Sequence, residues 1–311
     1  MKIAVVFTGG TIGSVVKGKW MSTDDSAKFA LIANYKKVAS DTEFVTSSPY
    51  TVLSENLSAK ELNLLQKEVE KNLEKDVDGI IVTHGTDSLH YTACALEYAF
   101  GNCEIPVVLV SSAYPLEDGR ENGNKNFEAA VEFIKSKKAK GVFVSYKNEK
   151  ETKTNIHIPT NMLQHSELSA DIYSITGEPF AQYDGKITLL RGERKVSEKT
   201  LGVVEYSENS GILVIDSHPG DGFGYSLDGV KAVILKPYHS ATLDTANENL
   251  HVFCRKAKEK DIPVFVVGVK SGVAYESTKL FDDIGIIPLP YGTFVSAYMR
   301  IWAELSKRKH L

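Results

Sequence analysis

The sequence of 311 residues has few cysteines, no long apolar run and no excess of basic residues. The three cysteines, Cys94, Cys103 and Cys254, lack CxxC spacing, so neither a disulfide framework nor a zinc site is expected. No apolar stretch approaches the ~20 residues of a membrane-spanning helix. The net charge of -4 gives no basic field for nucleic acid. We therefore expect no membrane association, no nucleic-acid partner and no bound metal.

The N-terminal stretch MKIAVVFTGG also lacks the features of a secretory signal. Its apolar run is too short for a signal-peptide core, and no small-residue cleavage site follows it. These absences predict a cytoplasmic protein.

Short runs of β-branched residues alternate with segments of helical periodicity along the chain. This alternation is typical of an α/β protein, in which a mainly parallel sheet is flanked by helices. The predicted strands are Ile3–Phe7, Gly79–Thr83, Val107–Ser111, Gly141–Tyr146, Ile212–Ile215, Val230–Leu235 and Val264–Val269.

The clearest helix lies in SAKELNLLQKEVEKNLEK, where Leu62, Leu65 and Val69 share one face. Ser58 and Glu61 have the spacing of a capping box at its start. Further helices are predicted within LHYTACALEYAF, NFEAAVEFIKSK, ANENLHVFCRKAKEK and TFVSAYMRIWAELSK.

The composition changes once, where charged residues crowd the stretch YDGKITLLRGERKVSEKTLGVVEYSENSG. A linker is predicted there at 191–208. It would separate a larger N-terminal domain, 1–190, which carries the candidate catalytic residues, from a smaller α/β domain at 209–311.

Two threonines flank a glycine pair in VVFTGGTIGS, directly after the first predicted strand. Gly9 and Gly10 allow a tight turn and a close approach of ligand, and Thr11 would face the crevice beyond the carboxyl end of the strand. The stretch has neither the G-x-G-x-x-G pattern nor the ending of a P-loop, which argues against phosphate binding. Alternatively, Thr8 and Thr11 satisfy backbone groups of the turn or cap the next segment.

A second stretch, GIIVTHGTDSLHYTA, repeats this arrangement. A buried strand ends near a glycine, and Thr86 and Asp87 follow at the expected start of a helix. Both residue types are ordinary helix caps, which is the alternative interpretation. Two strands that deliver Gly-Thr to one edge of a sheet, however, favour a shared binding site.

TGGTIG and HGTDS resemble the two signature motifs of the bacterial-type L-asparaginase and glutaminase family, and the resemblance extends over the whole chain. VLSENL resembles the family's substrate-binding segment and points to Ser54 and Glu55. SSAYP resembles the loop that places Ala113 beside the substrate amide. KETKTN resembles the segment with the family's lysine, here Lys153, although this lysine-rich run is otherwise typical of a solvated loop.

The resemblance implies a mechanism without a cofactor. Thr11 would attack the side-chain amide, Thr86 would hydrogen-bond to Lys153, and Asp87 would hold the α-amino group of the substrate and support the lysine. A threonine hydroxyl needs a positioned proton acceptor, and the N–H of Thr11 or Ala113 would serve as an oxyanion donor. The residues alone indicate only that two hydroxyls can converge.

Two positions depart from the family pattern. The lid after the first motif usually carries a tyrosine, whereas SVVKGKWMSTDD offers Trp20, which has an N–H donor and no acidic hydroxyl. Either Trp20 closes the lid, or proton transfer differs, or the substrate is not plain asparagine. Glu55 stands where a glutamine is common and would add a carboxylate beside the α-amino group.

The resemblance also implies a homodimer or homotetramer whose pockets are completed by a neighbouring subunit. The candidate stretch KPYHSATLDTAN offers His239, Ser240 and Thr242. We expect deamidation of L-asparagine to aspartate and ammonia. The alternatives are another amide (glutamine, a D-isomer or an N-substituted amino acid) and a catalytically silent amino-acid-binding or amidotransferase-subunit protein.

Overall fold

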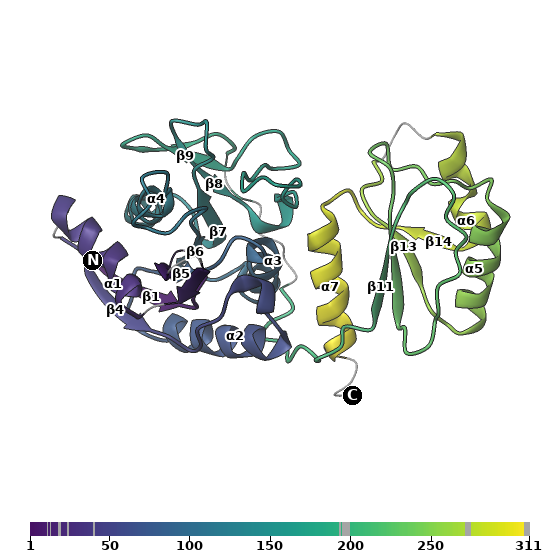
Figure 1. Cartoon of the computed structure of the whole chain (residues 1–311), viewed down its shortest axis with the longest axis horizontal. Helices are drawn as coiled ribbons and strands as arrows, with labels where there is room; N and C mark the ends of the chain where they lie inside the picture. Colours follow the sequence, from purple (N-terminus) through teal and green to yellow (C-terminus); the bar gives the residue numbers. More distant parts are fainter. Residues whose placement is uncertain are drawn as a thin grey trace. The chain divides into compact units, whose positions relative to one another are not determined.

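The computed structural model describes residues 1–10, 12, 14–17, 20–23, 25–39, 41–192, 194, 200–270 and 275–307, and of 14–17, 20–23 and 25–28 only the backbone. The chain divides into two compact units, Met1–Glu208 and Asn209–Leu311. Both units combine a sheet with helices (Figure 1), and the α/β class predicted from the sequence is confirmed.

The first unit contains, within the described residues, an eight-stranded sheet in the order β10-β9-β8-β7-β6-β5-β1-β4. The strands from β7 to β4 run parallel to one another, whereas β8, β9 and β10 are antiparallel to their neighbours. Parallel strands bring their carboxyl ends to one edge, which is where the two motifs lie. The strands are β1 (Lys2–Phe7), β4 (Glu43–Ser47), β5 (Gly79–Thr83), β6 (Pro106–Val110), β7 (Gly141–Tyr146), β8 (Thr154–His157), β9 (Ala181–Tyr183) and β10 (Ile187–Leu189).

Helices cover both faces of this sheet (Figure 1). Leu31 of α1 (Asp25–Val38) and Phe127 of α4 (Gly123–Ser136) belong to one buried cluster with Val5 of β1. Leu65 of α2 (Ala59–Leu73) packs in the cluster of the opposite face, together with α3 (Leu89–Phe100). Because both faces are buried, the central strands are continuously apolar.

Two predicted features of α2 and its surroundings are present. Ser58 and Glu61 form the capping box that the sequence predicted. After the first motif, the backbone forms an antiparallel hairpin of β2 (Ser14–Lys17) and β3 (Trp20–Thr23). Short 3-10 turns occur at η2 (Ser54–Asn56), η3 (Pro159–Asn161) and η4 (Glu276–Leu280).

The second unit has a four-stranded parallel sheet over its described residues, in the order β11-β12-β13-β14. Helices α5 and α6 pack on one face of it, and α7 packs on the other. The elements are β11 (Ile212–Asp216), β12 (Ala232–Lys236), β13 (Val264–Val266), β14 (Ile286–Pro288), α5 (Glu248–Glu259), α6 (Phe281–Ile284) and α7 (Phe294–Lys307).

The segment 191–208, which we expected to be a linker, lies within the first unit. Val204 and Tyr206 are buried there. Gln66 of α2 pairs with both backbone groups of Val204, donating at 2.9 Å and accepting at 3.1 Å. Asn63 pairs with Tyr206 in the same way at 3.0 and 2.7 Å. Amide side chains on α2 thus hold this segment as another strand would, which its charged composition concealed.

Arg194 fixes the same segment from its other end. Its guanidinium forms a buried ion pair with Glu97 of α3 and donates to the carbonyl of Val142 at 2.9 Å. Removing one partner of such a buried pair leaves an uncompensated charge, so this part of the segment belongs to the core of the first unit.

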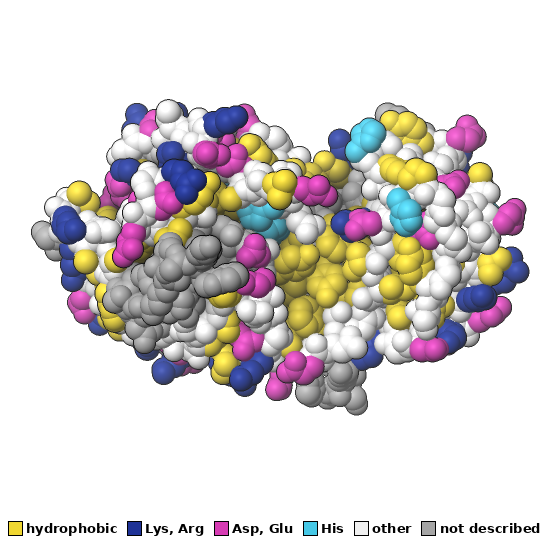
Figure 2. Space-filling view, viewed as in Figure 1, with side chains coloured by type: hydrophobic (Ala, Val, Ile, Leu, Met, Phe, Trp, Pro, Cys, Tyr) yellow, Lys and Arg dark blue, Asp and Glu magenta, His cyan; other side chains and the backbone are white. Residues whose placement is uncertain are grey.

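Charged side chains of both signs are interspersed over the face drawn in Figure 2. Among the described residues, no helix has the length and apolar character needed to cross a membrane.

Candidate active site

The turns that follow β1 and β5 meet through their glycines. Gly9 and Gly10 have φ values of +99° and +75°, in the left-handed region that favours glycine. A methyl group on Gly10 would lie 2.3 Å from the nitrogen of Gly85, and one on Gly9 would lie 2.4 Å from the carbonyl oxygen of Val52. The main chains of the two motifs therefore touch, with no room for a side chain between them.

Thr8 supports this contact. Its buried hydroxyl donates to the carbonyl of Thr83 at 2.6 Å, which joins the ends of β1 and β5. The prediction that Thr8 serves the turn is confirmed. Thr11, the expected nucleophile, lies outside the described residues, and so does the side chain of Trp20.

Ser54 connects two segments that the sequence assigned to substrate binding. Its hydroxyl donates to Asp87 Oδ2 at 3.1 Å, and the N–H of Asp87 points back to the same oxygen at 3.2 Å. Ser88 donates to the carbonyl of Ser54 at 2.6 Å. Ser54 is buried, whereas Glu55 and Asp87 are exposed. Thr86 is partly exposed beside them, so the η2 turn and the second motif form one wall.

Ala113 follows β6 at the same edge of the sheet, but its N–H is occupied. It donates to Asn122 Oδ1 at 2.8 Å, and the Asn122 amide donates in turn to the carbonyl of Lys147 at 2.7 Å. Our expectation that this N–H is a free oxyanion donor is corrected, because a buried N–H takes the nearest acceptor. Asn122 was missed in the sequence, where only its place before a helical stripe marked it as a helix cap.

A cavity of about 420 Å³ opens beside Ala113 at the carboxyl ends of β6 and β7. Tyr146 lies in its wall, and burial raises the pKa of Tyr146 to about 12. Most of the lining is polar or charged, from the loops after β6 and β7 and from residues 168–171.

Lys153 does not contact Thr86 in this structure. Its Nζ lies 3.3 Å from Asp184 Oδ2, and both side chains are largely exposed. Asp184 directly follows β9, and β9 lies on the side of β8 that faces away from β5. The expected Lys153–Thr86 hydrogen bond is therefore absent from the described contacts. An exposed pair of this kind contributes only about 0 to 1 kcal/mol, so little opposes its exchange for another partner.

Two buried histidines stand on either side of the second motif. His84 Nδ1 faces the carbonyl of Gly85 at 2.8 Å and its Nε2 faces the Thr92 hydroxyl at 2.9 Å. Burial lowers the pKa of His84 to about 4 and that of His90 to about 3. Both rings are therefore neutral at physiological pH. His165 contacts this turn as well, and it was missed in the sequence because no motif marks it.

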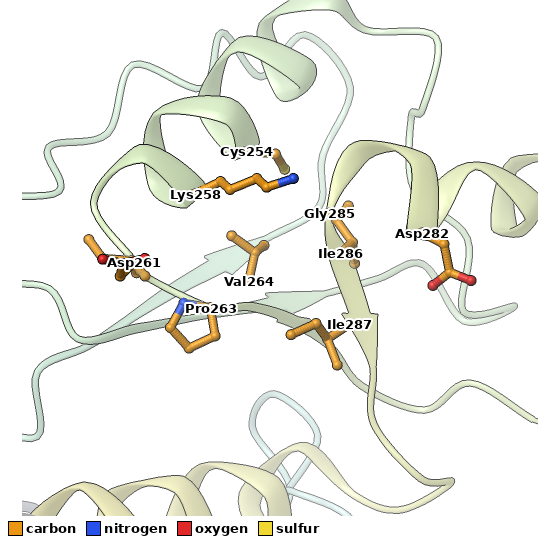
Figure 3. A pocket seen from close by; sticks show the side chains of 10 residues that line it. Cys254, Lys258, Asp261, Pro263, Val264, Asp282, Gly285, Ile286 and Ile287 are labelled. Carbon is orange, nitrogen blue, oxygen red and sulfur yellow. The ribbon is translucent and has the colours of Figure 1, made fainter.

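A second cavity, of about 420 Å³, lies in the second unit. Figure 3 shows Lys258 extending from α5 above Val264, with Ile286 and Ile287 of β14 beside it and Asp282 turned outward. Its lining contains no hydroxyl nucleophile from either motif.

The candidate partner-facing residues of the second unit form a tight turn after β12. Ser240 and Thr242 hydroxyls lie 2.9 Å apart, and the N–H of Tyr238 donates to the carbonyl of Thr242 at 3.0 Å. His239 is exposed. Over the described residues, no His, Cys, Asp and Glu side chains gather in a group that would hold a metal.

Residues 2–193 match the family model described as the N-terminal domain of asparaginase. The chain belongs to the asparaginase family. Solved asparaginase structures share its fold across nearly the whole chain. The thermostable L-asparaginase from Thermococcus kodakarensis is 20% identical, with a TM-score of 0.81, over 98% of this chain and 93% of that one. L-asparaginase I from Vibrio cholerae is 22% identical, with a TM-score of 0.80, over 99% and 93%.

Curated relatives of this asparaginase-family chain carry another name, that of a glutamyl-tRNA(Gln) amidotransferase component. The relative from Thermococcus kodakarensis is 28% identical over 70% of this chain and 50% of its own length. The relative from Methanobrevibacter smithii is 23% identical over 84% and 61%. The chain thus spans about half to three fifths of these relatives.

Proposed function

We propose that this asparaginase-family chain is an amidohydrolase that converts L-asparagine to L-aspartate and ammonia through an acyl-enzyme on Thr11. The observation that carries the proposal is the contact between Gly10 and Gly85. It brings the turn that precedes Thr11 against the turn that precedes Thr86, so both motifs open at one place.

In the proposed reaction, the hydroxyl oxygen of Thr11 attacks the carboxamide carbon and loses its proton to a base. The C–N bond breaks, the leaving nitrogen takes a proton and departs as ammonia, and an ester remains on Thr11. Water then cleaves the ester to release aspartate. General-base assistance of this kind is worth about 10² to 10⁴ in rate.

Asp87 and Ser54 support the binding half of the proposal. An exposed carboxylate at the rim of the site is suited to an α-ammonium group, and Ser54 holds that carboxylate at 3.1 Å. The base is proposed to be Lys153, acting through Thr86 after exchange of its partner Asp184. The N–H of Thr11 is left as the oxyanion donor.

Ammonia release from a panel of L-asparagine, L-glutamine and their D-forms tests the proposal. L-Asparagine should be turned over, and Thr11→Ala and Thr86→Ala should each abolish release. Thr8→Ser, which keeps the hydroxyl that supports the turn, serves as the folded control and should remain active. Full activity of Thr11→Ala would contradict the acyl-enzyme.

The curated relatives favour a second candidate, because they are named as components of a glutamyl-tRNA(Gln) amidotransferase. In this candidate the chain releases ammonia from glutamine. The same panel separates the two, since glutamine would then exceed asparagine in kcat/KM. We also propose a cytoplasmic homodimer or homotetramer with its sites at the interfaces between protomers, for which the molar mass in solution is the test.

A further inference from the structure

The ring of His165 lies between two backbone carbonyls. Its Nδ1 is 3.1 Å from the carbonyl oxygen of Asp171, and its Nε2 is 3.2 Å from the carbonyl oxygen of Thr86. The ring therefore links the loop at 165–171 with the turn that carries Thr86 and Asp87.

The two contacts require two protons on the ring. A carbonyl oxygen only accepts hydrogen bonds, and a neutral imidazole has a single N–H to donate. With one proton, one of the two carbonyls would face a nitrogen lone pair. Only the imidazolium form satisfies both contacts at once.

The groups around the ring leave His165 as the site of that proton. The ring of His90 stands edge-on at 4.6 Å between centroids, and its Nε2 faces the N–H of His165 at 3.2 Å, so this nitrogen is unprotonated. Burial, followed by the charge of His165, lowers the pKa of His90 to about 3. His90 also lies in the first turn of α3, where a second positive charge is unfavourable.

Negative charge is available on the other sides. Asp87 follows Thr86 directly in the turn, and Asp171 belongs to the loop that the ring contacts. Asp171 Oδ1 accepts the N–H of Glu149 at 2.9 Å, which holds the loop in place beside the cavity next to Ala113. His84, the remaining titratable neighbour of the turn, is kept neutral by burial.

We propose that His165 is a positioning residue, whose imidazolium form clamps the carbonyl of Thr86 and so holds the Thr86 hydroxyl in its reactive orientation. The kinetic consequence rests on the proposed function, whereas the charge state of the ring does not. As pH rises and the ring loses one proton, one of the two hydrogen bonds is lost and the turn is released.

The charge state is tested by ¹⁵N NMR of the histidine rings, with His165 assigned from its absence in His165→Gln. Both ring nitrogens should be protonated at pH 6. The thermal midpoint of His165→Gln should fall below that of the wild type by about 2 to 4 °C at pH 6, and by less at pH 8.5. A singly protonated ring at pH 6 would overturn the clamp.

His251→Gln is the matched control, because His251 Nε2 lies 2.8 Å from the single carbonyl of Thr245 in the second unit. One contact is satisfied by a neutral ring. The difference between the wild type and this variant should therefore not change with pH. An equal pH dependence in both variants would also count against the clamp.

The positioning role is tested by kinetics on the best substrate of the ammonia panel. In His165→Gln, kcat should fall about 10-fold at pH 6 while KM changes less than 3-fold. The decline of wild-type kcat toward alkaline pH should be flattened in the variant. An unchanged kcat beside a doubly protonated ring would reject the role. If the wild type turns over no amide, the proposed function fails, and the ring's charge and the midpoints still decide the clamp.

Discussion

Ser54 and Asp87, 33 positions apart in the sequence, exchange two hydrogen bonds through a single hydroxyl oxygen. The hydroxyl donates to the carboxylate and accepts the Asp87 N–H, so it fixes both the side chain and the backbone of Asp87. A carboxylate at a solvent-exposed rim otherwise samples several rotamers, and the serine selects one.

Ser54→Ala is expected to weaken substrate binding. A hydrogen bond to a charged group contributes about 1.5 to 3 kcal/mol, and partial replacement by water leaves a loss near 1.4 kcal/mol, which is about tenfold in KM. The measurement is KM for the best amide, with kcat changing less. Ser136→Ala is the control, because its hydroxyl donates to the carbonyl of Phe133 at the end of α4. Equal KM values in the two variants would remove Ser54 from substrate binding.

Gly10→Ala is expected to destabilise the protein far more than Gly177→Ala. Both glycines have a similar φ, +75° and +80°, but a methyl group on Gly177 meets nothing within 4 Å. The change at Gly177 should cost about 1 to 2 kcal/mol from the left-handed backbone alone. At Gly10 the clash with the Gly85 backbone adds to this, and we expect a total above about 3 kcal/mol in urea unfolding. Similar losses at both positions would show that the contact between the motifs is loose.

Lys153→Ala is expected to reduce kcat by about 100-fold or more while changing the free energy of unfolding by less than about 1 kcal/mol. Asp184→Asn, the partner variant, should leave stability unchanged in the same way and should not lower kcat, since it frees the lysine. Steady-state kinetics and urea unfolding of the two variants measure this. Retention of kcat in Lys153→Ala would assign the base to another group.

His157 is expected to make the protein sensitive to acid. Burial lowers the pKa of His157 from 6.5 to about 4, and its Nδ1 faces the Ser174 hydroxyl at 2.9 Å. Because the folded-state pKa is depressed, the unfolded chain binds the extra proton first. The stabilisation is complete above pH 6.5 and is lost as pH falls toward 4. For a single such histidine the loss at pH 5 is about 2 kcal/mol.

His157→Gln should therefore flatten the pH dependence of the free energy of unfolding between pH 7.5 and 5, whatever its stability at pH 7.5. His218→Gln, at an exposed position where Nδ1 faces the Asp216 carbonyl, should leave the slope as it is. Urea midpoints across this pH range measure both. A wild-type slope in His157→Gln would mean that the buried ring does not control acid sensitivity.

The sequence was most informative where local and long-range requirements coincide. Gly79–Thr83 and Gly141–Tyr146 were predicted with the bounds that β5 and β7 have, since a strand buried on both faces is apolar throughout. The edge strand β4 was missed because its half-exposed residues, Glu43–Ser47, have no such run. The antiparallel strands β8 and β9 escaped for a related reason, being short and interrupted by polar residues.

The candidate site divides in the same way. The meeting of the two motifs follows from topology, because β1 and β5 are adjacent and parallel. The side-chain partners do not follow from it. The pairing of Lys153 with Asp184 and the capture of the Ala113 N–H by Asn122 depend on loops whose course no periodicity encodes. His165 lies 79 positions from Thr86, and only the folded loop brings them together.

The contact of Gly10 with Gly85 joins one stretch of main chain to another, with no side chain taking part. Every amino acid has the same backbone, so substitutions elsewhere leave the form of such a junction untouched as long as its glycines are kept. Divergence can then rewrite the residues of the surrounding loops one by one while the two strand ends remain in register. A chain that shares only 20% of its residues with a solved asparaginase, and still has the same fold, is consistent with this economy of constraint.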